Sequence, residues 1–268
     1  MDTPGNTPLA DQRAEARRLV EGARQQGVTL RLIGGLAIRQ HCTILPFCER
    51  DYSDIDVVGL KAERHQIQDA FVELGYQPSE RFNALHGDTR LEFVDPVNER
   101  HVDVFLDTFE MDHYIDLRHR LALDDYTIPL SDLLLSKLQI VRLNEKDVRD
   151  ILTLLKDCDV SHDEAPSRPP FREVRRVGAS EDEPGVINVD YIIELCSCDW
   201  GLWKTLTTNV DKVRERMGDY ALTAEEQARV RERLANLKEM LVEAPKCLRW
   251  KLRDVVGERL QWYNVPEE

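Results

Sequence analysis

The sequence lacks the features of membrane-spanning and secreted proteins. Its uncharged apolar runs are far shorter than the roughly 18 residues that a membrane span needs. The opening segment MDTPGNTPLADQRAEARR has no apolar stretch behind basic residues. With 268 residues, of which 42% are hydrophobic, the chain is long enough to bury a core. These observations predict a globular, cytoplasmic protein with no membrane segment.

Basic residues are also fewer than acidic residues. Lys and Arg number 36 against 50 Asp and Glu, which gives a formal net charge of −14. Such a balance argues against passive coating of nucleic acid or of an anionic membrane. A local basic patch that binds RNA remains compatible with it.

Paired CxxC motifs are absent among the 6 cysteines. In a cytoplasmic chain we expect cysteines to act as small buried hydrophobic residues. The letters CSC at Cys196 and Cys198 are a weaker candidate for a metal or redox site.

Hydrophobic periodicity divides the first part of the chain into helices and strands. Apolar residues at helical spacing predict a helix over Leu9–Gln25, and the β-branched run VTLRLI predicts a strand that leads into Gly34 and Gly35. A helix, the strand DYSDIDVVG and a further helix follow. TRLEFVD and RHVDVFLD flank the turn-like PVNE and predict an antiparallel hairpin. Two helices, in SDLLLSKLQIVRL and EKDVRDILTLLK, complete the order.

The fold class predicted from this order is α/β, of the α+β type, with a small mixed β-sheet under helical cover. We expect the sheet domain over residues 1–156 and a linker or long mobile loop over 157–185, which is rich in proline and charge. An all-helical C-terminal domain is expected over 186–268. There Thr223 and Glu226 predict a capping box, and a core stripe follows at Val230, Leu234, Leu237 and Leu241.

Two aspartates stand on the strand after the glycines. Because alternate side chains of a strand share a face, Asp54 and Asp56 project together, about 6.5 to 7 Å apart. Uncompensated carboxylates at this spacing repel, and a divalent cation commonly resolves the conflict. Hard oxygen ligands favour Mg²⁺ or Mn²⁺. On its own, a DxD motif is more often a solvated strand face or a turn.

The two glycines before this strand support the interpretation as a metal site. Gly34 and Gly35 let the backbone approach a phosphate closely and leave amide N–H groups free to face it. A magnesium ion held by carboxylates completes its shell with water and substrate phosphates. The combination predicts phosphoryl or nucleotidyl chemistry.

A two-metal site, with ions about 3.5 to 4 Å apart, needs a third acid from a neighbouring strand. Asp103 is the best candidate, because Val102 and Val104 on either side of it face the opposite way. Asp107 and Glu92 are weaker candidates. Asp107 lies at the end of its strand, and the phase of Glu92 depends on the hairpin register.

The order of these motifs resembles the nucleotidyltransferase superfamily that shares its fold with DNA polymerase β. The matching residues are Gly34-Gly35, Asp54-Ile55-Asp56 and Asp103, and the resemblance spans roughly Leu32 to Leu155. The chain is most similar to the AbiEii-type bacterial proteins, which include type IV toxins, and to aminoglycoside nucleotidyltransferase-like proteins. Many members have Gly-Ser where this chain has Gly-Gly.

The resemblance implies a metal-dependent transferase of the EC 2.7.7 type. Such an enzyme moves a nucleoside monophosphate from a nucleoside triphosphate such as ATP to an acceptor hydroxyl and releases pyrophosphate. Two Mg²⁺ or Mn²⁺ ions would be held by Asp54, Asp56 and Asp103, which are also the expected catalytic acids. The resemblance also implies phosphate contacts from Gly34 and Gly35.

A lysine and a later acidic pair extend the resemblance. Lys137 would neutralise triphosphate charge as a catalytic and nucleotide-binding cation. Asp147, with Asp150 three residues later, would orient Lys137 or the nucleotide. A surface ion pair of these acids with Lys146 or Arg149 is an equal alternative.

The acceptor is left open by the sequence. A toxin-like enzyme would act on tRNA or protein and could have an antitoxin partner, whereas a relative of the resistance enzymes would adenylylate a small hydroxylated molecule. A non-catalytic nucleotide-binding module is the third alternative. We expect the C-terminal helices to close over the cleft and to help select the acceptor.

Overall fold

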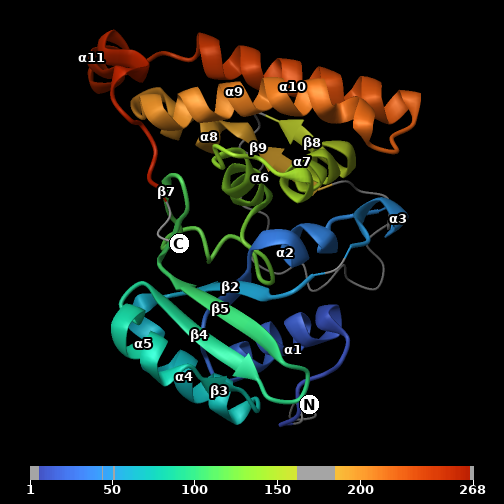
Figure 1. The fold of residues 1–268 in the computed structure, drawn as a ribbon, viewed down its shortest axis with the longest axis vertical. Coiled ribbons are helices and arrows are strands. Elements are labelled where there is room, and N and C mark those ends of the chain that lie inside the picture. Colours follow the sequence, from blue (N-terminus) through green and yellow to red (C-terminus); the bar gives the residue numbers. More distant parts are fainter. Residues whose placement is uncertain (1–5, 44, 51, 162–184, 266–268) are drawn as a thin grey trace.

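A five-stranded mixed sheet lies in the lower half of the molecule as it is drawn in Figure 1. The computed structural model describes residues 6–43, 45–50, 52–161 and 185–265. The strands lie in the order β1-β2-β5-β4-β3. Their bounds are Leu30–Leu32 for β1, Ile55–Gly59 for β2, Gln77–Pro78 for β3, Arg90–Asp95 for β4 and Arg100–Leu106 for β5. The predicted small mixed sheet is therefore confirmed.

Only the central pair of the sheet is parallel. β2 runs parallel to β5, whereas β1 pairs antiparallel with β2, and β4 with both β5 and β3. The antiparallel pairing of β4 with β5 confirms the predicted hairpin. Since the parallel pair needs a crossover, helices and β3–β4 separate β2 from β5 in the sequence.

One face of the sheet is apolar and packs on two helices, α1 (Gln12–Gln25) and α4 (Arg64–Glu73). Alternate residues of the strands point to this face, and they are fully buried. Phe71 of α4 stacks on Phe93 of β4, with ring centroids 4.2 Å apart. The alternation leaves the polar residues of β2, β4 and β5 on the opposite face.

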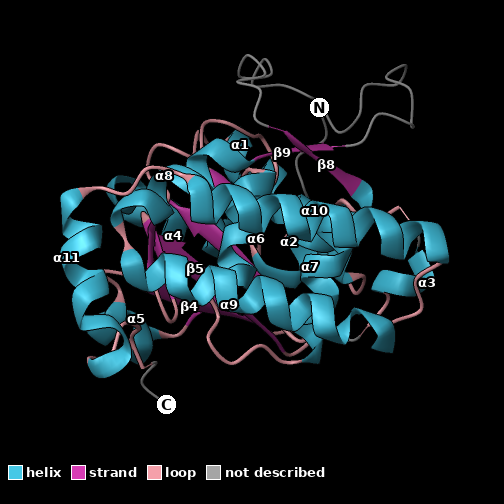
Figure 2. Cartoon of the chain, turned by 90° about the horizontal axis from the view of Figure 1, so that it is seen from above, coloured by secondary structure: helices cyan, strands magenta, loops and turns pink. Residues whose placement is uncertain are grey.

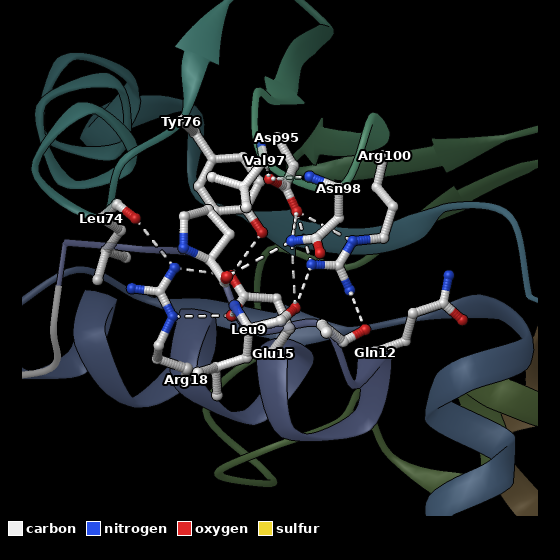
Figure 3. A network of polar contacts seen from close by, with 12 residues as sticks. Leu9, Gln12, Glu15, Arg18, Leu74, Tyr76, Asp95, Val97, Asn98 and Arg100 are labelled. Carbon is white, nitrogen blue, oxygen red and sulfur yellow. Dashed lines mark hydrogen bonds and ion pairs between the residues drawn. The ribbon is translucent and has the colours of Figure 1, made fainter.

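A buried polar network ties α1 to the sheet (Figure 3). Glu15 is fully buried and accepts hydrogen bonds from Arg18 at 2.7 Å and from the Tyr76 hydroxyl at 2.6 Å. Beside it, Arg100 pairs with the buried Asp95 at 2.6 Å. Burial, followed by the bond to Glu15, raises the pKa of Tyr76. The hydroxyl therefore stays a donor to the carboxylate.

Replacing Tyr76 with phenylalanine is expected to lower the free energy of unfolding by about 1.5 to 3 kcal/mol, the usual worth of a hydrogen bond to a charged group. The ring and its edge contact with Phe71 are kept, so packing changes little. Urea denaturation measures the loss. Tyr114→Phe is the control, because that side chain is 57% exposed and should change stability by less than about 0.5 kcal/mol.

Helices cover the other side of the sheet in two tiers (Figures 1 and 2). The first tier holds α2 (Gly34–Gln40), α6 (Leu130–Leu138) and α7 (Glu145–Asp157), which contact one another. The second holds α8 (Val189–Cys198), α9 (Trp200–Arg216), α10 (Ala224–Glu243) and α11 (Leu248–Val256). The capping box at Thr223 and Glu226 is present, and the predicted stripe on α10 is fully buried.

The C-terminal helices are joined to the first tier by polar contacts as well as by the core. Asn209 of α9 is fully buried and donates hydrogen bonds to the carbonyls of Leu138 at 2.8 Å and Ile140 at 2.7 Å. One hydrophobic core runs through both tiers and the sheet. A domain boundary near residue 156 therefore stays a prediction.

The predicted linker is partly ordered at its ends. Cys158–Ser161 forms β8, which pairs in parallel with β9 (Gly185–Asn188); residues 162–184 of the predicted linker lie outside the described residues. Helix α6 begins with Pro129 as its N-cap. None of the helices that the structure describes is long and apolar enough to cross a membrane.

Several short elements are not evident from the sequence. They are α3 (Leu45–Cys48), α5 (Glu80–His86), β6 (Thr108–Glu110) and β7 (Tyr114–Asp116).

The expectation that all cysteines are free is wrong for Cys42 and Cys48, which form a disulfide between the end of α2 and α3. The chain turns back there and brings the two Cα atoms within 6.5 Å. Cys158 and Cys196 are free and buried, as expected, but Cys198 is free and exposed.

Candidate active site

Three carboxylates lie in one row across the polar face of the sheet. In the parallel pair, Asp56 of β2 is opposite Asp103 of β5, and in the hairpin Asp103 is opposite Glu92 of β4. Directly opposed residues of neighbouring strands share a face. The register thus brings Asp56 and Asp103 together as predicted, and it adds Glu92, whose phase the sequence left open.

The glycine turn lies directly against the first carboxylate of the row. Gly34 has φ +74°, and a Cβ at this position would lie 2.6 Å from Oδ2 of Asp56. The amide N–H of Ile33 donates to the Asp56 carbonyl at 3.0 Å. Gly35 is equally confined, since a Cβ there would collide with the guanidinium of Arg50. The backbone conformation therefore favours glycine at position 34, whereas a side chain at position 35 would have to displace the Arg50 guanidinium.

Replacing Gly34 with alanine is expected to destabilise the protein more than the same change at Gly27. Both glycines have φ near +75°, where alanine costs about 1 to 2 kcal/mol. Nothing lies within 4 Å of a Cβ at Gly27, whereas at Gly34 the Cβ meets Asp56. Urea denaturation of the two variants isolates the contact. Equal losses would contradict the close approach of the turn to Asp56.

Asp56 carries the least compensated charge of the row. Burial, followed by the negative charges of Asp103 and Asp54, raises its pKa from 3.8 to about 6. The cations Lys137 and Arg90 act in the opposite direction but do not cancel these effects. A further cation would thus be favoured beside Asp56.

Asp103 is instead neutralised by Arg90, a residue of β4. The guanidinium binds both carboxylate oxygens, with Nε 2.9 Å from Oδ1 and Nη2 2.6 Å from Oδ2. Asp54 precedes β2, is exposed, and accepts a hydrogen bond from Ser53 at 2.7 Å. The three predicted acids therefore share one region but have different surroundings.

Lys137 of α6 lies between the two acids of α7. Its Nζ is 3.2 Å from Asp147 and 3.0 Å from Asp150. Burial alone would lower the pKa of Lys137, but the two carboxylates outweigh it and raise the pKa, so the side chain is an ammonium at neutral pH. Among the described residues both acids thus pair with Lys137, whereas Arg149 pairs with Glu145. Whether the acids orient Lys137 or a nucleotide stays a prediction.

Arg50 completes this cluster, although no sequence motif predicts its position. It binds Asp150 at 2.9 Å and lies 4.5 Å from the ring centre of Tyr52. The segment between α3 and β2 thus links Gly35 to α7. Asp147 also caps its own helix through Asn144, so its carboxylate serves two partners.

Asp107 does not join the row. It has φ +64°, and its carboxylate accepts the amide N–H of Lys61 at 2.8 Å, beside the start of a short 3-10 helix. This position at the end of β5 turns the side chain away from Asp103, and the role of Asp107 is structural.

A divalent ion at this site fits the charge of Asp56 and Asp103. The guanidinium of Arg90 already neutralises Asp103, whereas the negative charge of Asp56 is not fully compensated. Within the described residues, however, no three His, Cys, Asp or Glu side chains are arranged to hold a metal ion. The two-ion site of Asp54, Asp56 and Asp103 therefore stays a prediction.

A hollow adjoins the row at Glu92. It has a volume of about 430 Å³ and lies between β4 and α5. Asn83 of α5 fixes this edge by bonding both backbone groups of Glu92, at 2.7 and 3.0 Å. The lining is largely apolar, with carboxylates at Glu80 and Glu92; its other members are Ser79, Arg81, Phe82, Leu85 and His86.

Comparison with known proteins gives a distant structural similarity. The sequence matches no protein-family model and no curated protein. A solved structure that resembles this one is the antibiotic-resistance factor ANT(2'')-Ia, at 13% sequence identity and a TM-score of 0.38, over 53% of this chain and 82% of that chain. The chemistry of the site must therefore be inferred from its own residues.

Proposed function

We propose that the protein is a metal-dependent nucleotidyltransferase. The observation that carries the proposal is the row of Asp56 and Asp103, opposed on parallel strands beneath the turn of Gly34. Two carboxylates held at one point, one with a raised pKa, favour a divalent cation and its phosphate ligand. The buried ammonium of Lys137 lies close enough to lower the pKa of Asp56.

Each residue then has a role that its surroundings support. Asp56 and Asp103, with Asp54, would hold Mg²⁺ or Mn²⁺, which when bound neutralises charge on the transferred phosphoryl group. Lys137 would attract the triphosphate, and the Gly34 turn lets its backbone come close to Asp56 and a bound phosphate. Asp103 would accept the proton of the acceptor hydroxyl.

The test is incubation of the full chain and Mg²⁺ with each of four labelled nucleoside triphosphates and three acceptor classes. These are total tRNA, protein, and small hydroxylated molecules such as aminoglycosides. Label transferred to one class, with release of pyrophosphate, is the expected result and identifies the acceptor. The Asp103→Asn variant should transfer none. Metal-independent nucleotide binding without transfer to any class would instead support a binding module.

The hollow beside Glu92 is where we expect part of the acceptor to bind, because Glu92, which lines it, is opposite Asp103 in the strand register. Leu85→Arg would place a long charged side chain there, at a residue that is 71% exposed. We expect KM for the acceptor to rise about tenfold while KM for the nucleotide stays constant, since only acceptor binding is obstructed. A KM for the acceptor that is the same in the Leu85→Arg variant and in the wild type would contradict this placement.

A further inference from the structure

Arg90 binds the two carboxylate oxygens of Asp103 that would otherwise be free to bind a metal ion. Its two bonds satisfy both carboxylate oxygens, in the forked geometry that makes arginine–carboxylate pairs strong and directional. The Asp103 side chain is only 13% exposed. A cation approaching Asp103 from the polar face of the sheet therefore meets the guanidinium first.

The position of Arg90 is supported by aromatic rings rather than by a second acid. Its Cζ lies 5.2 Å from the ring centre of Phe105 on β5 and 5.5 Å from that of Phe82 on α5. Such contacts hold a guanidinium with modest energy and do not consume its hydrogen-bond donors. The Arg90 side chain is 40% exposed, so it has a path to withdraw.

We propose that Arg90 is a positioning residue that keeps Asp103 closed to divalent ions until an ion displaces it. This inference rests on the proposed function, because it assigns a control to the same carboxylate. It supplies a released guanidinium with free donors near the triphosphate, an anion that arginine binds well.

The experiment measures Mn²⁺ binding to the full chain by calorimetry in the absence of nucleotide. Arg90→Met keeps an aliphatic side chain against Phe82 and Phe105 but removes the charge. We expect this variant to bind Mn²⁺ at least about tenfold more tightly than the wild type, because no charge-assisted pair must be broken first. Arg90→Lys restores a point charge without the fork and should fall between the two.

The matched control is Arg118→Met. Arg118 binds both carboxylate oxygens of Asp116 outside the site, so its loss removes a similar pair without touching Asp103. Its Mn²⁺ affinity should equal that of the wild type. An Arg90→Met variant that binds Mn²⁺ no more tightly than the wild type overturns the inference.

Asp103→Asn in both backgrounds separates the two proposals. If Mn²⁺ affinity depends on Asp103 but not on Arg90, only the control by Arg90 is wrong. If affinity never depends on Asp103, the proposed function itself is wrong.

A measurement on the unmodified protein covers the case in which Arg90→Met fails to fold. The NMR signal of the Arg90 Nε–H reports its bond to Asp103 directly. Addition of Mg²⁺ should shift that signal and speed its exchange with water. An unchanged signal while Mg²⁺ binds would overturn the inference.

Discussion

Replacing Asp56 with asparagine is expected to abolish nucleotidyl transfer and, at neutral pH, to make the fold more stable. Activity should fall by about 10³-fold or more, because the residue that faces both the glycine turn and Asp103 loses its charge. Stability should rise because ionised Asp56 is unfavourable in the folded protein. Its pKa is about 6, against 3.8 as the ordinary value.

The pH dependence of this gain is fixed by the direction of the shift. A raised pKa means that the folded chain binds the Asp56 proton more tightly than the unfolded chain does. The stabilisation by that proton is full below about pH 4 and is lost as pH rises through about 6. At 1.36 kcal/mol per pKa unit, the asparagine variant should gain up to about 3 kcal/mol at pH 7 and nothing at pH 4.

Urea denaturation in EDTA, between pH 4 and pH 7.5, measures both halves of this prediction. Asp54→Asn is the matched control, because Asp54 is exposed and its neutralisation should change stability by less than about 0.5 kcal/mol. A destabilised Asp56→Asn variant at pH 7 would show that this carboxylate makes a favourable contact in the metal-free protein, and would remove the physical reason for a cation there.

The polar face of the sheet could be predicted in part, because it follows from local rules. Strand alternation places Asp103 on the face opposite to Val102 and Val104, and the letters PVNE predict the hairpin, but only the register of the structure shows that Glu92 lies on the same face as Asp103. The acidic partners of Lys137 are implied by the resemblance alone, with pairing to Lys146 or Arg149 as an equal alternative. Short-range periodicity decides only where the strand side chains point.

What could not be predicted depends on contacts between distant segments. Arg90 and Asp103 are 13 residues apart, and Arg50 and Asp150 are 100 apart. An arginine that binds a carboxylate across strands has the same sequence signature as an exposed one. Asp107 shows the limit of alternation. Counting from Asp103 by twos would put Asp107 on the same face, but the backbone of Asp107 has φ +64° and leaves the strand conformation.

The two cations of the site, Arg90 and Lys137, differ in burial. This difference predicts different roles for them. Arg90 is 40% exposed and rests on aromatic rings, so its guanidinium can reach solvent once its pair with Asp103 is broken. Lys137 is 14% exposed and is held by two carboxylates that are themselves 7% and 5% exposed. A cation in that setting is fixed, so we expect Lys137 to stabilise the fold as well as to take part in the proposed chemistry.

Replacing Lys137 with methionine should therefore lower the free energy of unfolding by about 3 to 5 kcal/mol, the cost of leaving buried charge without its partner. Asp150 would keep Arg50, but Asp147 would keep only its cap on Asn144. Urea denaturation at pH 7 measures the loss. The control is Lys146→Met, at an exposed lysine of α7, the helix that carries Asp147 and Asp150. It should change stability by less than about 0.5 kcal/mol.

A second change distinguishes a structural from a chemical role of Lys137. Adding Asp147→Asn to Lys137→Met removes the unpaired carboxylate while keeping an oxygen for the cap, so we expect at least half of the lost stability to return, because the two side chains are coupled. Transfer activity should not return with it, since the triphosphate would still lack its ammonium. Recovery of both would show that Lys137 acts only through the fold, whereas recovery of neither would mean that Asp147 is not the group that Lys137 neutralises.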